Sequence, residues 1–274
     1  MKFLKRLFEF YINSSVHVAL AVCSLVGITF LEFGQKVNLN LLFFVFFATV
    51  TGYNFVKYFG LAKFHHRNLA TWLKYIQIFS FFCFLGLIYF TFQIQIVTLY
   101  ALVGLGLITF LYAIPFLPKK IFLEKGNLRA ISGLKIYVIA FVWAVTTVVV
   151  PMIENAQQLT FDILISFLQR FVYVLVVMLP FEIRDMRYDS LKLGTIPQRI
   201  GMRKTKIIGS ILAGLLLVLE LLKDELNLNH FLVLSIIVGL VIVFVFQSSI
   251  KQCPYYSSFW VEGIPIFWLG LSLI

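Results

Sequence analysis

The residues best suited to chemistry lie in the stretch 180–201, which reads PFEIRDMRYDSLKLGTIPQRIG and is the most polar run of a very apolar chain. Asp185 and Asp189 are four residues apart, so on a helix their side chains share one face, and Glu182 joins that face three residues earlier. Carboxylate oxygens are ligands that Mg²⁺ prefers, and a bound phosphate can complete its coordination. The spacing therefore predicts a Mg²⁺ site built by these three acids.

A solvated charged face is the alternative interpretation of the same acids. Basic residues alternate with them, at Arg184, Arg187 and Lys192. Structural ion pairs produce the same pattern, so the spacing alone leaves both interpretations open. The helical pattern ends at Gly194, because glycine adopts the left-handed conformation at a helix end without a Cβ penalty. Thr195 and Gln198 then resemble a capping box that opens another short helix.

The stretch also resembles the second aspartate-rich motif of the UbiA-type intramembrane prenyltransferases. The features that match are the spacing Asp185-x3-Asp189, the arginine before it, and the run GTIP at 194–197 followed by Gly201. A second match resembles the loop after that family's fourth helix. It consists of LYAIP at 111–115, GLK at 133–135 and, between them, Lys119, Lys120, Gly126 and Arg129.

This resemblance implies both a fold and an activity. The fold is a bundle of nine membrane helices around a lipid-accessible cavity. The activity is transfer of an isoprenoid chain from a prenyl diphosphate, through Mg²⁺, to a lipid-like or aromatic acceptor. Asp185 and Asp189 would then hold the ion, and Tyr112 would help to position the diphosphate. Lys119, Lys120 and Arg129 would bind phosphate, although a tyrosine and basic residues are also common at a membrane surface for reasons of topology.

The first aspartate-rich motif of that family is absent. It belongs at the end of the second helix, where this chain reads TGYNFVKYFG at 51–60, and no Asp or Glu occurs between Glu32 and Glu124. Asn54 resembles the flank of the motif, and Lys57 stands close behind it. A lysine supplies a fixed point charge for phosphate but cannot form the octahedral coordination of a metal ion. We therefore expect Asn54 and Lys57 in the substrate site and at least one ion to be lost.

The composition places these motifs in a membrane. Of the 274 residues, 61% are hydrophobic and 13% are charged, and the mean hydropathy is +0.96. A soluble domain has roughly 25% charged residues. The net charge of +11 could indicate nucleic acid, but the basic residues lie between apolar segments, which indicates topology instead. We expect a multi-pass membrane protein of one helical domain, 1–274, surrounded by membrane lipid and without a nucleic-acid partner.

Nine apolar segments are each long enough to cross a membrane, so the predicted fold class is an all-α polytopic bundle. They are 14–32, 39–58, 72–92, 96–114, 134–153, 162–181, 206–223, 230–249 and 259–274. Of the 23 Lys and Arg residues, 20 fall in 1–13, 57–74, 115–135, 182–206 and 250–258. The positive-inside rule then puts the N-terminus in the cytoplasm, the C-terminus outside and the predicted site on the cytoplasmic face.

The sequence thus predicts a UbiA-like prenyltransferase with a degenerate metal site, in the cytoplasmic membrane of a bacterium, acting on a prenyl diphosphate and a lipophilic acceptor. One alternative is a non-catalytic homologue that binds an isoprenoid lipid or a protein partner, as the missing first motif suggests. Another is a small transporter, although few ionisable residues besides Arg170 fall within the predicted spans. A buried arginine at that position faces a cavity or a partner, or extends towards the surface.

Overall fold

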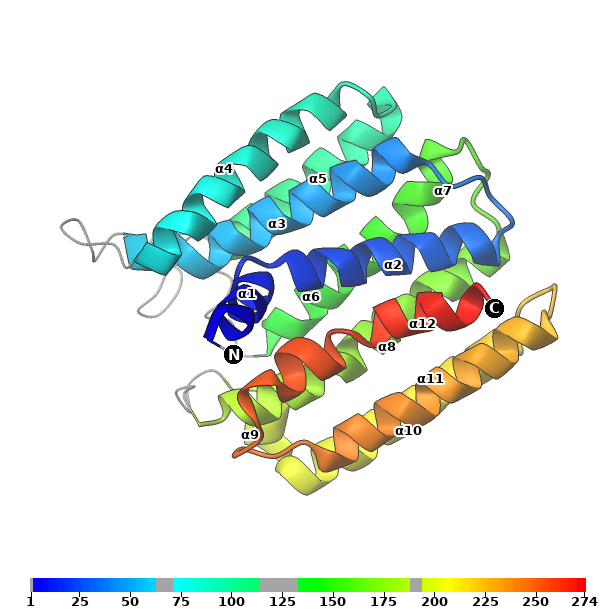
Figure 1. The fold of residues 1–274 in the computed structure, drawn as a ribbon. Coiled ribbons are helices and arrows are strands. Elements are labelled where there is room, and N and C mark those ends of the chain that lie inside the picture. Colours follow the sequence, from blue (N-terminus) through cyan, green and yellow to red (C-terminus); the bar gives the residue numbers. More distant parts are fainter. Residues whose placement is uncertain (1, 63–70, 114–132, 188–193) are drawn as a thin grey trace, which may run out of the picture.

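The computed structural model describes residues 2–62, 71–113, 133–187 and 194–274 (Figure 1). Within these residues the chain is helical and contains no strand. The helices are α1 (Lys2–Asn13), α2 (Val16–Glu32), α3 (Leu39–Ala62), α4 (Thr71–Thr91), α5 (Ile96–Ala113), α6 (Leu134–Ala144), α7 (Val150–Glu154), α8 (Phe161–Asp185), α9 (Ile196–Ile200), α10 (Met202–Glu220), α11 (Leu228–Gln247) and α12 (Ile264–Ser272). Two π-helical turns, Val145–Val149 and Tyr256–Val261, lead into α7 and towards α12.

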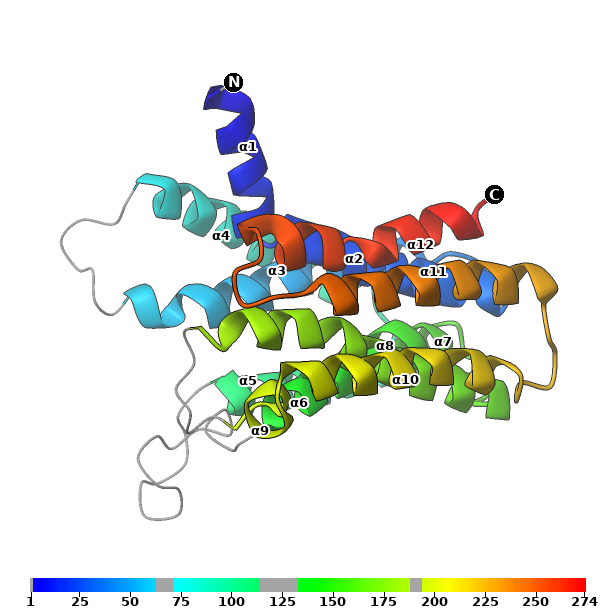
Figure 2. The same ribbon diagram turned by 90° about the horizontal axis from the view of Figure 1, so that it is seen from below.

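The long helices run side by side, so that the bundle has two ends (Figures 1 and 2). We call the end where α3 ends and α6 begins the inner end, because the sequence predicts it to be cytoplasmic. The opposite end, where α2 ends and α8 begins, is the outer end. Helix α2 lies between α3 and α12, and α8 lies between α6 and α10. Because α2 is apolar on all sides except for a few polar residues and Glu32 at its end, most of it is buried.

A proline explains the irregular helical turn between α6 and α7. Pro151 lacks a backbone N–H, so the carbonyl of Thr147 cannot form the helical bond that residue 151 would otherwise donate. The chain widens into a π-helical turn there, and the hydroxyl of Thr29 in α2 donates to that carbonyl at 2.7 Å. An unsatisfied carbonyl is costly in an apolar bundle, so this contact fixes α2 against the α6–α7 junction.

The tight turn between α4 and α5 is closed by a buried acid from α7. The carboxylate of Glu154, 3% exposed, accepts from the backbone N–H of Gln95 at 3.2 Å and from the amide of Asn38 at 3.5 Å. The side chain of Gln95 donates in return to the carbonyl of Glu154 at 2.8 Å. One carboxylate therefore ties two outer-end loops to α7.

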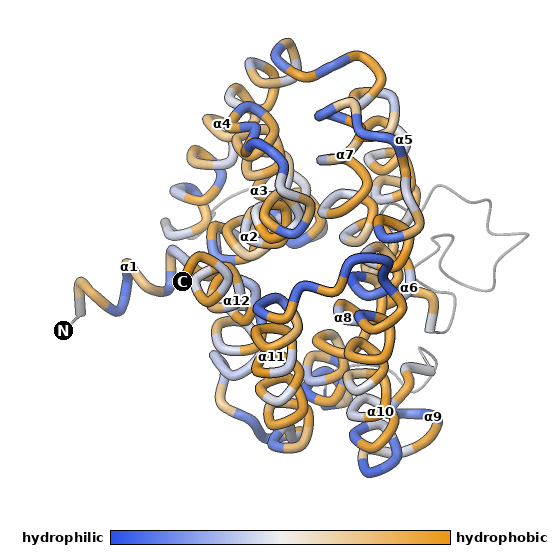
Figure 3. The backbone as a smooth tube through the Cα atoms, turned by 90° about the vertical axis from the view of Figure 1, so that its right-hand side faces the viewer, coloured by the Kyte–Doolittle hydropathy of each residue, from blue (hydrophilic) through white to orange (hydrophobic). Residues whose placement is uncertain are grey.

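The number of membrane spans is not settled by the structure. Among the described residues, five helices are long and apolar enough to cross a membrane, or six if the bent pair α1 and α2 forms one span. The five are Leu39–Tyr58, Trp72–Thr91, Leu134–Glu154, Phe161–Asp185 and Leu228–Gln247. The count of nine therefore stays a prediction, as does the single domain 1–274. The tube in Figure 3 shows apolar residues along all the long helices.

The start of α12 is packed so closely that one added methyl group should destabilise the protein. A Cβ added to Gly263 would lie 2.7 Å from the backbone oxygen of Phe259 and 3.2 Å from the ring of His17. We expect Gly263→Ala to destabilise the protein by about 1–3 kcal/mol, the usual cost of overpacking. Thermal unfolding of the purified protein in lipid nanodiscs would measure the loss.

The matched control is Gly104→Ala in α5, where an added Cβ meets nothing within 4 Å. Alanine has the higher helix propensity, so this variant should be neutral or slightly stabilising. Equal melting temperatures for the two variants would contradict the close packing at Gly263.

Candidate functional site

The two motifs found in the sequence meet at the inner end. Gly133, directly before α6, and Gly194, shortly before α9, both have positive φ angles, 77° and 50°. A Cβ at Gly133 would lie 3.7 Å from the carbonyl oxygen of Gly194. Glycine adopts such φ angles without strain, so both chain segments can turn sharply here. The motifs 111–135 and 180–201 therefore meet in space at Gly133 and Gly194, which are 61 residues apart in sequence.

Asp185, at the last position of α8, is held by two cations. Its Oδ1 accepts from Arg184 Nη2 at 2.8 Å and Nε at 2.9 Å, and its Oδ2 lies 3.7 Å from Lys135 Nζ. The three side chains are between 22% and 29% exposed, so the cluster lies at a partly open surface. It connects the end of α8 to the start of α6. Lys135, the last residue of the GLK run, was not among the predicted site residues.

Lys57 reaches the same region from α3. Its ammonium group donates to the carbonyl of Asn13 at 3.4 Å and lies 5.6 Å from the ring centre of Tyr58. Lys57 and Arg184 both interact electrostatically with Glu262, a half-buried acid before α12. Charged residues from α3, α8 and the approach to α12 therefore gather at the inner end. The sequence signal for Glu262 was its position as the one acid of the predicted last span.

Glu182 lies one turn before Asp185 and is buried, with 1% exposure. Its Oε2 accepts from the backbone N–H of Ile196, the first residue of α9, at 3.3 Å. A carboxylate is favourable at a helix N-terminus, so Glu182 attaches α9 to α8. The Gln198 half of the predicted capping box is also present, since its side chain accepts from the backbone N–H of Thr195 at 3.1 Å.

Asn54 is buried and its amide is engaged within the protein. Both amide hydrogens are donated, to the carbonyl of Ser14 at 3.0 Å and to the hydroxyl of Ser80 at 2.8 Å. Its oxygen accepts from the hydroxyl of Ser15 at 2.8 Å. An amide has two donors, so binding a substrate phosphate through them would break a structural contact. The predicted substrate contact of Asn54 stays a prediction.

Several predicted site residues lie outside the described part of the chain. They are Asp189, Lys119, Lys120 and Arg129. The backbone of Tyr112 belongs to the last turn of α5, but its side chain is not described. The expectation that one helix continues from Asp185 to Gly194 was wrong, because α8 ends at Asp185 and a turn follows. The shared helical face predicted for Asp185 and Asp189 therefore has no support.

As they lie, the described carboxylates do not fit a Mg²⁺ ion. Both oxygens of Asp185 face cations, and Glu182 accepts a backbone hydrogen bond. Within the described ranges, no group of three His, Cys, Asp or Glu side chains is placed to hold a metal. A metal ion would have to displace Arg184 or Lys135 from Asp185. The Mg²⁺ site thus stays a prediction that depends on Asp189.

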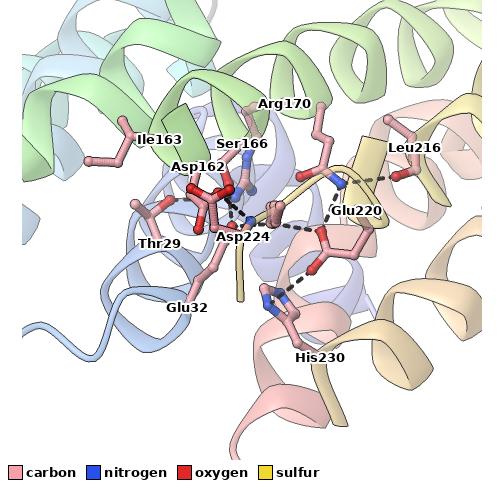
Figure 4. Close-up of polar contacts among 12 residues, drawn as sticks. Thr29, Glu32, Asp162, Ile163, Ser166, Arg170, Leu216, Glu220, Asp224 and His230 are labelled. Atoms are coloured by element: carbon pink, nitrogen blue, oxygen red, sulfur yellow. Dashed lines mark hydrogen bonds and ion pairs between the residues drawn. The ribbon is translucent and has the colours of Figure 1, made fainter. Parts of the chain in front are cut away.

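A second polar cluster, at the outer end, was missed by the sequence analysis (Figure 4). The ammonium group of Lys223 lies 2.6 Å from Glu32 and 2.6 Å from Glu220, and all three side chains are at most 8% exposed. Glu220 also accepts from the amide of Gln169 at 2.8 Å and lies 3.8 Å from His230. Ser166 donates to Glu32. We call these six residues the outer cluster.

Arg170 lies beside the outer cluster and is buried. Its side chain therefore faces a partner within the bundle and does not extend towards the surface. Its Nη2 donates to the hydroxyl of Thr29 at 3.5 Å, and its guanidinium lies 5.1 Å from the ring centre of Trp268. The positive charges of Lys223 and Arg170 balance the negative charges of Glu32 and Glu220. The adjoining cavity has a volume of about 10 Å³, close to the minimum for one water molecule.

The charges of the outer cluster balance and its cavity is small. The cluster therefore holds the helices together at this end and leaves no room for a large substrate. It joins α2, α8, α10 and α11. Removing one partner of a buried ion pair leaves an uncompensated charge, which is far costlier than losing an exposed pair. The inner end is therefore the better candidate for chemistry.

Lys223→Met should show this dependence. The substitution keeps the aliphatic stem but leaves Glu32 and Glu220 without their shared cation, so we expect a loss of about 3–5 kcal/mol. Chemical or thermal unfolding in nanodiscs would measure it. The control is Lys36→Met, which removes an exposed lysine at the same end and should change stability by less than about 0.5 kcal/mol. If Lys223→Met lowers the free energy of unfolding no more than the control does, the outer cluster does not hold the helices together.

Comparisons with known proteins support the fold and leave the chemistry open. No family model matches the chain, and no curated protein matches it. A solved structure reported for digeranylgeranylglyceryl phosphate synthase in membranes matches 98% of this chain and 96% of its own, with a TM-score of 0.58 and 15% sequence identity. At that identity the likeness shows the fold alone. With its apolar helices, the chain is an integral membrane protein, and its helical fold is similar to that of the synthase structure.

Proposed function

We propose that this protein is a UbiA-like membrane prenyltransferase, which transfers an isoprenoid chain from a prenyl diphosphate to a lipid-like or aromatic acceptor. The proposal rests mainly on the fold, which is similar over nearly the whole chain to the structure reported for digeranylgeranylglyceryl phosphate synthase in membranes. A shared fold alone does not establish a shared reaction. The arrangement of charges at the inner end supplies the second argument.

The inner end offers cations from several helices to one anionic group. Lys135 lies in the first turn of α6 and Arg184 in the last turn of α8, and both contact Asp185. Lys57 of α3 and Arg184 both interact with Glu262. Lys119, Lys120 and Arg129 belong to the segment that leads directly into Gly133. A diphosphate is recognised by several cations at once, with arginine providing a planar pair of donors. We infer that this group of cations binds the diphosphate.

Transfer requires that the bond between the prenyl C1 carbon and the diphosphate oxygen breaks. The electron pair of that bond stays on the diphosphate, and the acceptor supplies the electron pair of the new bond to C1 and loses a proton. Cations placed around the leaving diphosphate stabilise its growing negative charge, most effectively where water is scarce. Asp185 acts in this scheme as a positioning residue, because it holds Arg184 and Lys135 in place between turnovers. Tyr112 would help to position the diphosphate.

Magnesium remains part of the proposal only through Asp189. If the segment after Arg187 brings Asp189 next to Asp185, the two carboxylates and the diphosphate would coordinate the ion, with Glu182 nearby. The ion would then neutralise charge on the departing diphosphate. Without it, lysine and arginine carry that task alone.

A non-catalytic homologue is the second candidate, and two observations favour it. Asp185 is already paired with two cations, and the chain lacks the first aspartate-rich motif. A protein with this arrangement could bind a prenyl diphosphate or another isoprenoid lipid without breaking its C1–oxygen bond. The two candidates differ in turnover, not in the location of the ligand.

The test is release of diphosphate by the purified protein in nanodiscs, supplied with labelled prenyl diphosphates of several chain lengths and with lipid and aromatic acceptors. We expect release by the natural protein and a loss of about 100-fold or more in Asp185→Ala, comparable to removing one group that stabilises transition-state charge. Repeating the assay with a chelator separates the Mg²⁺-dependent scheme, in which release stops, from one that relies on cationic side chains.

The matched control is Asp162→Ala, which removes an acid from the outer end of the same helix α8. This variant should retain its activity. If no chain length and no acceptor gives release above the level of Asp185→Ala, the enzymatic proposal fails. Binding of a labelled prenyl diphosphate that is weakened in Lys135→Met would in that case support the non-catalytic candidate.

A further inference from the structure

Helix α1 has a different character from the other long helices. Its polar side chains are Lys2, Lys5, Arg6, Glu9 and Asn13, and the remaining seven residues are apolar or aromatic. At 100° per residue these polar positions fall within roughly a third of the circumference, and Phe3, Leu4 and Leu7 lie on the other side. The polar side carries three basic residues and one acid, with Lys5 and Glu9 3.9 Å apart. Such a clean division is typical of a helix at a membrane surface.

The structure turns α1 away from the bundle. The axes of α1 and α2 differ by 55°, and Figures 2 and 3 show α1 extending sideways from the inner end, across the direction of the long helices. Ser15 between the two helices has a φ of 63°, a left-handed conformation that costs energy for a residue other than glycine. A bundle that spans a membrane would thereby place α1 along the membrane surface.

The bend is held by side chains of α3. Asn54 donates to the carbonyl of Ser14 at 3.0 Å and accepts from the hydroxyl of Ser15 at 2.8 Å. The hydroxyl of Tyr58 donates to the carbonyl of Asn13 at 2.7 Å. Three consecutive residues at the bend are thus bonded to a neighbouring helix. The direction of α1 is a built feature of the fold.

In the part of the chain that the structure describes, the second half of α1 packs its apolar side against protein. Phe8 packs edge to face against Phe259 with ring centres 5.1 Å apart, and Phe10 packs against Phe79 at 5.5 Å. No described residue covers the first half in this way, and Phe3, Leu4 and Leu7 are 75%, 67% and 55% exposed. These exposed apolar side chains lie beside basic residues. They therefore favour a binding partner that has an apolar region directly next to an anionic one.

We propose that α1 lies in the plane of the membrane at the cytoplasmic surface and binds anionic lipid. Phe3, Leu4 and Leu7 enter the acyl-chain region, and Lys5 and Arg6 contact negatively charged headgroups. Helix α1 is too short and too charged to cross a bilayer itself. Charge complementarity favours lipid over a protein, since basic residues near the surface of an anionic leaflet add directly to membrane affinity. This proposal does not depend on the prenyltransferase activity.

The test is site-directed spin labelling of the full chain in nanodiscs, after the free cysteines Cys23, Cys83 and Cys253 have been replaced. Labels are placed singly at Leu4→Cys and Leu7→Cys on the apolar side and at Lys5→Cys and Arg6→Cys on the polar side. Two reference labels calibrate the depth: Ile211→Cys on the apolar surface of α10, and Lys36→Cys in an exposed outer loop. Accessibility to oxygen reports the acyl-chain region, and accessibility to a water-soluble nickel chelate reports water.

We expect the labels at 4 and 7 to match the one at 211, and the labels at 5 and 6 to match the one at 36. If all four labels are as open to the nickel chelate as the label at 36, α1 projects into water and the proposal fails. If all four are shielded from both reagents, protein covers the helix, and the proposal of a lipid partner fails as well.

A second comparison tests the headgroup charge. In an equal mixture of phosphatidylcholine and phosphatidylglycerol, the label at 4 should be deeper and less mobile than in phosphatidylcholine alone. The double substitution Lys5→Glu and Arg6→Glu, at two exposed positions, should abolish that difference while the protein keeps its melting temperature. The same depth in both lipids would overturn the anionic part of the proposal.

Discussion

A charge inside an apolar bundle must find its opposite within the bundle, because neither lipid nor hydrocarbon side chains can solvate it. The two ends of this protein meet that constraint in different ways. At the outer end two carboxylates and two basic side chains are buried together and cancel, around a cavity of about 10 Å³. At the inner end Asp185 is shared by Arg184 and Lys135, and further basic residues follow in the adjoining segments. In the function proposed above, an anionic ligand would bind to these basic residues.

Backbone groups obey the same constraint and explain which polar side chains the apolar helices retain. Thr29 satisfies the carbonyl that Pro151 leaves without a donor, and Asn54 and Tyr58 satisfy carbonyls at the bend between α1 and α2. These residues hold irregular backbone in place where lipid could not. Asn54 in particular forms three hydrogen bonds to neighbouring segments, so it has a structural role whether or not it contacts a substrate.

Much of the fold could be predicted from the sequence because apolar segment length is a local property. Each predicted segment falls on a helix, or on helices joined by a π-helical turn, in the described residues, although this does not make every one a span. The side-chain pairs could not be predicted in the same way. Glu32 and Lys223 are 191 residues apart, and nothing local shows that two helix ends will meet. The prediction that the helix continues past Asp185 was also wrong, because residue spacing indicates a shared face only while the helix continues.

The chain has a lysine at residue 57 and no acid between Glu32 and Glu124, which limits how the proposed site at the inner end could bind an anion. A pair of carboxylate clusters binds a diphosphate through metal ions, so its affinity depends on the metal and on ligand geometry. A group of lysines and arginines binds the same anion directly, so its affinity depends on charge and falls as salt screens it. Lys57 is exposed, and Asp185 is already engaged by cations. In the function proposed above, the anion would therefore bind to basic side chains directly, and a metal ion could coordinate Asp185 only by displacing Arg184 or Lys135.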